Sequence, residues 1–242
     1  MFHARRILPA MIVLSALAAL AVAADAGKPV LPFDGKTFDG WNCKGAAPAE
    51  SQWAVGLAKV DPADPKMLVA EPAGPDAAAL VCTSGHGKGK QGRDLFSTQK
   101  FGDCTVELEV MVPQGSNSGI YLMGEYEVQV LDSFGREKLG PGDMGGIYGA
   151  QAPKVNACKK PGEWQKYVIE FRAPRFDAAG QKTANAKFIK ITLNGQVLHE
   201  NVEMQKQTPG GVQGKEAAEG PLMFQGNHGP VAYRNIKVTP AK

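Results

Sequence analysis

Long apolar runs and amphipathic helices are missing from the chain after its first two dozen residues. A helix that crosses a bilayer needs about 20 consecutive apolar residues, so we expect no membrane span in the mature chain. The chain also has no large excess of charge of either sign. The formal charge of +3 falls to about +1 once Arg5 and Arg6 are removed. This balance indicates neither a nucleic acid nor an acidic surface as a partner.

The first residues have the pattern of a secretory signal peptide. His3, Arg5 and Arg6 precede an apolar stretch, Ile7 to Leu20, and Ala21-Val22-Ala23 offers a small-residue cleavage site. An uncleaved membrane anchor is the alternative, but the apolar stretch is short for one. We therefore predict a signal peptide over residues 1–23, export to the periplasm or beyond the cell, and a single domain over residues 28–242.

Cysteine is rare in the chain. The four thiols are those of Cys43, Cys82, Cys104 and Cys158. An even count in an exported protein favours two disulfides, and three pairings are possible. The spacings do not match a zinc site, which needs close Cys or His pairs.

Two short motifs suggest enzyme classes that the surrounding sequence does not support. Gly87–Gly92 has the Gly-x-Gly-x-x-Gly spacing, but no helical period follows to aim amide groups at a pyrophosphate. Gly115–Gly119 has the glycine spacing of a nucleophile elbow, but its central residue is Asn117. The sequence thus supports neither a nucleotide enzyme nor a serine hydrolase.

Short strands and turn residues dominate the rest of the chain. Thr105–Val112 alternates apolar and polar residues, as a half-buried strand does. Asn194-Gly195 separates Phe188–Leu193 from Gln196–Glu200, which predicts a hairpin with a type I′ turn. Many such strands joined by Gly- and Pro-rich turns predict an all-β sandwich.

The stretch Asn117–Asp132 contains the clearest functional pattern. Glu125, Glu127 and Gln129 fall on one face of a predicted strand, with apolar side chains on the other. This polar face could simply meet solvent. It could instead be the floor of a binding groove, with Glu127 and Gln129 reaching the ligand.

A second polar cluster lies near the carboxyl terminus. Gln225, Asn227 and His228 occupy a loop rich in glycine. A loop histidine is often only a satisfied polar group, but three hydrogen-bonding side chains this close together also suit a ligand site. Tyr148 belongs to the long irregular segment Asp132–Pro161, which could form a wall of the groove because long loops in compact domains are often functional.

Two blocks of sequence together closely resemble the 3-keto-disaccharide hydrolase domain family. One block is Asn117-Ser-Gly-Ile-Tyr121 with Tyr126–Asp132, and the other is Gln225–Gly229 with Tyr233–Ile236. The resemblance extends from about Leu31 to Pro240. It implies a concanavalin A-like jelly-roll β-sandwich with a concave sugar-binding face. It also implies cleavage of glycosides whose sugar is oxidised at C3, by hydrolysis or by a lyase and hydratase route, with help from a divalent metal cation.

The family's motifs and the chemistry of a 3-keto sugar point to the candidate site residues. A ketone at C3 acidifies the C2 proton, so a base can remove it and the C1 substituent can leave before water adds back. The family's Tyr-Glu-x-Gln and Gln-x-x-His-Gly elements fall on Tyr126–Gln129 and Gln225–Gly229. We expect Glu127 and His228 to act as base or as metal ligands. The candidates for contacts with the sugar are Asn117, Gln129, Tyr148, Arg172 and Gln225.

Two other functions remain open from the sequence. An ordinary retaining glycosidase of the laminarinase type needs two carboxylates about 5–5.5 Å apart, but Gln129 stands where the second one would be. A non-catalytic carbohydrate-binding module is the other alternative, because jelly-roll sandwiches also bind sugars without cleaving them.

Overall fold

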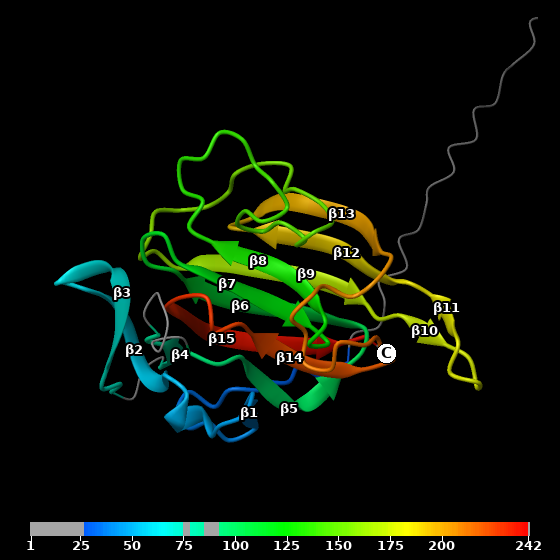
Figure 1. Cartoon of the computed structure of the whole chain (residues 1–242), viewed down its shortest axis with the longest axis horizontal. Coiled ribbons are helices and arrows are strands. Elements are labelled where there is room, and N and C mark those ends of the chain that lie inside the picture. Colours follow the sequence, from blue (N-terminus) through cyan, green and yellow to red (C-terminus); the bar gives the residue numbers. More distant parts are fainter. Residues whose placement is uncertain (1–26, 75–77, 85–91, 242) are drawn as a thin grey trace, which may run out of the picture.

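The computed structural model describes residues 27–74, 78–84 and 92–241 (Figure 1). The predicted signal peptide and residues 87–91 of the glycine-rich motif lie outside these ranges. Across the described ranges, no helix is long and apolar enough to cross a membrane. The one helical turn described is the short 3₁₀ segment Pro48–Glu50.

The first of two main sheets contains the strands formed by the stretch Asn117–Asp132. Its strands are arranged antiparallel in the order β1-β5-β14-β7-β8. Strand β8 is therefore at an edge of this sheet. The bounds are β1 Trp41–Cys43, β5 Leu95–Phe101, β14 Gly220–Phe224, β7 Asn117–Leu122 and β8 Tyr126–Leu131.

The second main sheet has eight strands, in the order β13-β12-β9-β6-β15-β4-β2-β3, and lies behind the first in Figure 1. A separate pair, β10 (Arg175–Phe176) and β11 (Lys182–Ala184), extends from one end. The bounds in the eight-stranded sheet are β13 Gln196–Met204, β12 Ala186–Leu193, β9 Gln165–Arg172, β6 Cys104–Met111, β15 Val231–Pro240, β4 Ala79–Cys82, β2 Trp53–Asp61 and β3 Asp64–Glu71.

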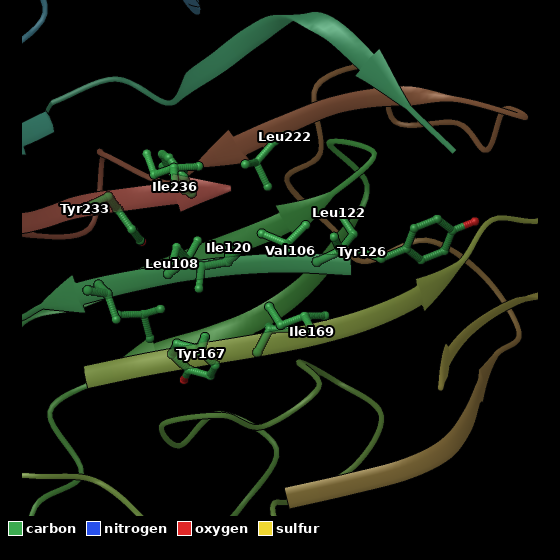
Figure 2. Packing of buried hydrophobic residues seen from close by; sticks show 14 of the residues in the cluster. Val106, Leu108, Ile120, Leu122, Tyr126, Tyr167, Ile169, Leu222, Tyr233 and Ile236 are labelled. Carbon is green, nitrogen blue, oxygen red and sulfur yellow. The ribbon is translucent and has the colours of Figure 1, made fainter. Parts of the chain in front are cut away.

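The hydrophobic core fills the space between the two sheets. Strand β6 contributes Val106 and Leu108, and strand β7 contributes Ile120 and Leu122 (Figure 2). All four side chains are buried, as the alternation of apolar residues along each strand requires. The prediction of an all-β, concanavalin-like jelly-roll sandwich is confirmed.

The local strand predictions are confirmed where turn residues bounded them. Asn194 and Gly195 have φ values of 52° and 83°, as a type I′ turn requires at both central positions. Strands β1, β2, β5, β10 and β11 were not predicted. The second hairpin strand is longer than predicted, because β13 continues to Met204.

The prediction of two disulfides is wrong, because all four cysteines are free thiols. Cys43 lies 3.0 Å from the Ser51 hydroxyl, and Cys82 hydrogen-bonds to Ser84 over 3.2 Å. Cys104 is buried at the start of β6, and Cys158 is half-buried in the segment before β9. The thiols are thus accommodated by polar neighbours or by burial in different parts of the sandwich.

Candidate active site

The polar face of β8 is buried. Glu125, Glu127 and Gln129 are each 3% exposed, so the solvent-facing interpretation of this strand is wrong. Two segments cover the strand by hydrogen bonds along its free edge. Tyr148 N donates to Glu127 O over 3.2 Å, and Thr208 N donates to Glu125 O over 2.8 Å.

A pocket of about 240 Å³ opens over the middle of this face. Its floor contains the buried Tyr121, Glu127 and Gln129, whereas Tyr148 and His228 are exposed at its rim. Six of the seven residues predicted for the site meet there. The lining residues are Asn117, Tyr121, Glu127, Gln129, Tyr148, Pro209, Gly210, Gln225 and His228.

The Glu127 carboxyl group has a pKa near neutral pH. Burial raises the pKa of Glu127 to about 7, and the negative charge of Asp94 acts in the same direction. A hydrogen bond from the Tyr121 hydroxyl to Oε2 of Glu127, 2.8 Å long, opposes the rise. A carboxylate with a pKa near the working pH is suited to general-base catalysis.

The neighbouring strand makes room for this carboxylate. Gly119 lies on β7, which pairs with β8 so that Gly119 is opposite Gln129. A Cβ atom at Gly119 would overlap with the Glu127 carboxylate. Glycine at this position therefore lets the Glu127 side chain lie close against the backbone of β7.

The side-chain amide of Gln129 is fixed on the pocket floor. Its Nε2 donates to Asn117 Oδ1 over 2.6 Å, which fixes the orientation of the amide. Its Oε1 is buried and has no hydrogen-bond partner within the described part of the chain. A buried acceptor without a partner is unfavourable by about 1–3 kcal/mol.

His228 is held at the rim by its own loop. One ring nitrogen, Nδ1, hydrogen-bonds to Asn227 Oδ1. The loop is also attached to the rest of the sandwich, because Asp94 Oδ1 accepts a hydrogen bond from Gly226 N over 3.2 Å. Burial raises the pKa of Asp94, whereas the Gly226 hydrogen bond and Lys44, 3.8 Å away, lower it. Asp94 therefore connects the loop of His228 to the sandwich.

Arg172 is the one predicted site residue that the structure does not bring to the pocket. It ends β9 in the eight-stranded sheet, whereas the pocket lies over the five-stranded sheet. The burial of its neighbour Phe171 in the core directs Arg172 to the other face of β9.

Sequence reasoning missed several residues of this region. Tyr121 lies directly opposite Glu127 in the β7–β8 hairpin, and the turn at Gly124 was a signal from which this pairing could have been found. Pro209 and Gly210 come from the polar segment between β13 and β14, which contains no recognisable motif. Asp94 has no local pattern that marks it.

The predicted divalent cation lacks a complete set of protein ligands here. Among the described residues, no three His, Cys, Asp or Glu side chains are grouped so that they could hold a metal ion. Glu127 and His228 supply two candidate donors, and divalent cations are usually held by more protein or water ligands. The residues described do not by themselves fit a resident metal.

Comparison with known proteins identifies the family. The family described as "3-keto-alpha-glucoside-1,2-lyase-like domain" matches residues 28–239. The chain belongs to this family. This is the family that the two sequence blocks resemble. Both blocks contribute to the pocket, through Asn117, Tyr121, Glu127 and Gln129 from the first and through Gln225 and His228 from the second.

Individual proteins and solved structures are also similar to this chain. A 3-keto-disaccharide hydrolase of Bacteroides thetaiotaomicron is 30% identical over 119 residues, which is 48% of this chain and 34% of that protein. The match thus spans about a third of that relative's length. A candidate glycosyl hydrolase of Parabacteroides distasonis is 26% identical, with a TM-score of 0.63, over 97% of this chain and 93% of that one. A second from the same organism, 16% identical with a TM-score of 0.57, covers 88% and 94% and shares the fold.

Proposed function

We propose that this protein cleaves the glycosidic bond of 3-keto-glycosides, with Glu127 as the base that removes the C2 proton. The observation that carries the proposal is the Glu127 carboxyl, whose pKa is raised to about 7 on the floor of a pocket lined by hydrogen-bonding groups. Near neutral pH such a group is available both to take up a proton and to return it.

The reaction can be written with this carboxylate alone as base. Glu127 takes the proton from C2, and the C2–H electrons form an enolate with the C3 carbonyl. The enolate re-forms the carbonyl as the C1–O bond breaks, which leaves a double bond between C1 and C2. The departing oxygen takes up a proton. Water then adds to C1 and a proton returns to C2, so the net change is hydrolysis.

The rim of the pocket offers groups for the departing oxygen and for the sugar. His228 and Tyr148 are exposed at the mouth, where a leaving alcohol would meet solvent, and either ring can donate a proton or a hydrogen bond. Gln129 lies on the pocket floor, and its Oε1 has no hydrogen-bond partner among the described residues. Asn117 and Gln225 also line the pocket and add amide groups.

The geometry favours this route over an ordinary retaining glycosidase. Retention needs a second carboxyl about 5–5.5 Å from the first. Within the described lining of the pocket, Glu127 is the one carboxylic acid. Glu125, its neighbour on the same face, accepts hydrogen bonds from Gln213 N and Gly214 N instead.

A product assay on purified protein tests the proposal. A 3-keto-glucoside and its unoxidised parent would each be incubated with the wild type and with Glu127→Gln, with and without a chelator. We expect turnover of the keto substrate only, and a loss of at least about 100-fold in Glu127→Gln, in line with the usual contribution of general acid–base catalysis. Glu200→Gln is the matched control, because Glu200 is on an exposed face and pairs with Lys154.

Each other result points to a different function. Turnover of the unoxidised parent would indicate an ordinary glycosidase, and sugar binding without turnover would indicate a binding module. Full activity in Glu127→Gln would remove Glu127 from the mechanism. Loss of activity with the chelator, restored by a divalent cation, would place a metal in the reaction and make Glu127 and His228 its first candidate ligands.

We further propose that the protein acts outside the cytoplasm, on the basis of the signal-peptide pattern in residues 1–23. Amino-terminal sequencing of the protein exported by its native host tests this, and we expect the mature chain to begin just after Ala23. A chain that retains residues 1–23 in the cytoplasm would contradict it.

A further inference from the structure

Residues 207–216 form a strap across β8 at the Glu125 end of the polar face. The strap follows β13 and precedes β14, and its chain crosses in front of the sheet in Figure 1. Thr208 N donates to Glu125 O, and Val212 N donates to Gly124 O, each over 2.8 Å. The Thr208 hydroxyl also accepts from Glu127 N over 3.1 Å. The strap is therefore joined to the strand that carries the proposed base.

The Glu125 side chain is the central anchor of the strap. Its Oε1 accepts from Gln213 N over 2.7 Å and from Gly214 N over 3.2 Å. Its Oε2 is buried and has no partner among the described atoms. Gly211 packs so closely that a Cβ atom there would overlap with this Oε2. A carboxylate that is 3% exposed is costly to bury, and its two hydrogen bonds are both directed at the strap.

Further contacts hold the middle and the carboxyl-terminal end of the strap. Lys44 Nζ donates to Gly211 O over 3.0 Å, and Tyr126 OH donates to Glu216 over 2.7 Å. The strap's Pro209 and Gly210 line the pocket, and Tyr121 OH lies 3.2 Å from Pro209 O. The strap is thus both a cover over Glu125 and a wall of the pocket beside Glu127.

We propose that Glu125 is a positioning residue that holds this strap closed, and that the strap limits the pocket to a terminal 3-keto sugar ring. The pocket volume of about 240 Å³ is below the roughly 300–1,000 Å³ of sites that enclose drug-sized ligands. With the strap across the Glu125 end, a sugar attached to the far side of the oxidised ring has no path along the strand. The leaving group departs at the rim, where His228 and Tyr148 are exposed. This inference rests on the proposed function and adds to it the position of the oxidised ring.

The test uses two substrates, the wild type and three variants. One substrate is a disaccharide with the ketone on its terminal ring, and the other is a trisaccharide with the ketone on its middle ring. In both, the bond to be cleaved is at C1 of the oxidised ring. The proteins are the wild type, Glu125→Ala, which removes the anchor, and Gly211→Ala, which pushes on the anchor from the strap side. Glu125→Gln keeps an acceptor oxygen and serves as the conservative rescue.

We expect the wild type to prefer the terminal-ring substrate by about 100-fold in kcat/KM, the upper range of steric discrimination by a pocket. In Glu125→Ala and Gly211→Ala this preference should fall to about tenfold or less, and Glu125→Gln should restore most of it. Hydrogen exchange of a peptide covering residues 207–216 is the second readout. It should be faster in the two loosened variants than in the wild type and in the control Glu200→Ala, with unchanged exchange in β9.

The outcomes separate this inference from the proposed function. Faster exchange in the strap with an unchanged substrate preference would overturn the inference alone. A wild type that cleaves the middle-ring substrate as well as the terminal one would do the same. If the wild type cleaves neither keto substrate, the proposed function fails and this inference fails with it. If Glu125→Ala does not fold, Gly211→Ala carries the test, because its change is made on the strap.

Discussion

Tyr121 and Glu127 face each other across the β7–β8 hairpin, and the tyrosine hydroxyl donates to Glu127 Oε2 over 2.8 Å. The pair shares the floor of the pocket with Gln129. The hydroxyl has a second acceptor in reach, Pro209 O at 3.2 Å. Glu127 can therefore gain a proton without leaving the Tyr121 hydroxyl unsatisfied, which suits a group that takes up and releases a proton in each cycle.

The first prediction concerns the pH profile of the wild type. The base must be ionised, and burial raises the pKa of Glu127 to about 7. We therefore expect kcat/KM for a 3-keto-glucoside to fall tenfold per pH unit below about pH 7. A carboxylate with the ordinary pKa of 4.5 would begin this fall only near pH 4.5. A steady-state pH profile measures this. An acid limb that begins only below pH 5 would contradict the raised pKa of Glu127.

The second prediction changes the pKa of the base through its partner. The Tyr121 hydrogen bond lowers the pKa of Glu127, so Tyr121→Phe should move the acid limb to higher pH. Tyr167→Phe is the matched control, because the Tyr167 hydroxyl bonds to the backbone oxygen of Gln129 and not to Glu127. The assignment of Glu127 as the base would be contradicted if the acid limb of the pH profile does not move in Tyr121→Phe. It would also be contradicted if the limb moves as far in Tyr167→Phe.

The third prediction is a gain in stability at the expense of activity. The pKa of Glu127 is higher in the folded chain than the ordinary 4.5, so the folded state binds this proton more tightly than the unfolded state. The penalty for burying the ionised group is then present above about pH 7 and disappears below about pH 4.5. Glu127→Gln removes it. The variant should be more stable than the wild type at pH 8, by at most about 3 kcal/mol, with the difference shrinking toward pH 5.

Denaturant unfolding at several pH values measures the third prediction. The Glu200→Gln control should not show this pH-dependent gain, since the Glu200 side chain is exposed and pairs with Lys154. Equal stability of Glu127→Gln and the wild type at pH 8 would mean that Glu127 is not penalised by burial.

The fourth prediction concerns the room that Gly119 leaves for the base. A Cβ atom there would overlap with the Glu127 carboxylate, and misplacing a reacting group by about 1 Å can lower the rate about 100-fold. We expect Gly119→Ala to lower the activity about 100-fold, while strand β7 still forms. Gly74→Ala is the control, because a Cβ atom at Gly74 would have no atom of the described residues within 4 Å. Normal kinetics in Gly119→Ala would show that the carboxylate can move without loss.

The fifth prediction concerns the four free thiols. Burial raises the pKa of Cys82 to about 11 and that of Cys104 to about 12, so little reactive thiolate is present at neutral pH. Without added reductant, a thiol reagent should react slowly with the native protein and titrate four thiols after unfolding. Cys158, which is half-buried, should react first. Fewer than four thiols in the unfolded protein would show that a disulfide forms.

The sequence was informative wherever a local pattern fixed the structure. The alternation around Glu127 predicted both the strand and the residues on its polar face, because side chains of a strand alternate between two faces. Applied to β9, the same rule would have directed Arg172 away from the pocket, since Phe171 is a core residue. The resemblance to a family supplied what the local pattern could not, namely that Gln225 and His228 meet this strand.

The parts that could not be predicted depend on contacts between distant segments. Gln225 reaches the pocket because β14 pairs with β7, where Gln225 N bonds to Gly119 O over 3.0 Å. The strap is polar and rich in glycine, as a solvated loop would be, and its position is set by backbone hydrogen bonds to β8 that leave no mark in the sequence. Asp94 acts through the backbone of Gly226, which is equally hidden.

The two segments that cover β8 have a consequence for how the protein behaves in a concentrated solution. An edge strand with free N–H and C=O groups is a template onto which another chain can add. Here Thr208 and Tyr148 bond to that edge from either side of Glu127. The walls of the pocket thus also keep one molecule from joining its sheet to that of the next. A variant selected for wider substrate access through a looser strap should then show a greater tendency to aggregate, so selectivity and solubility would change together.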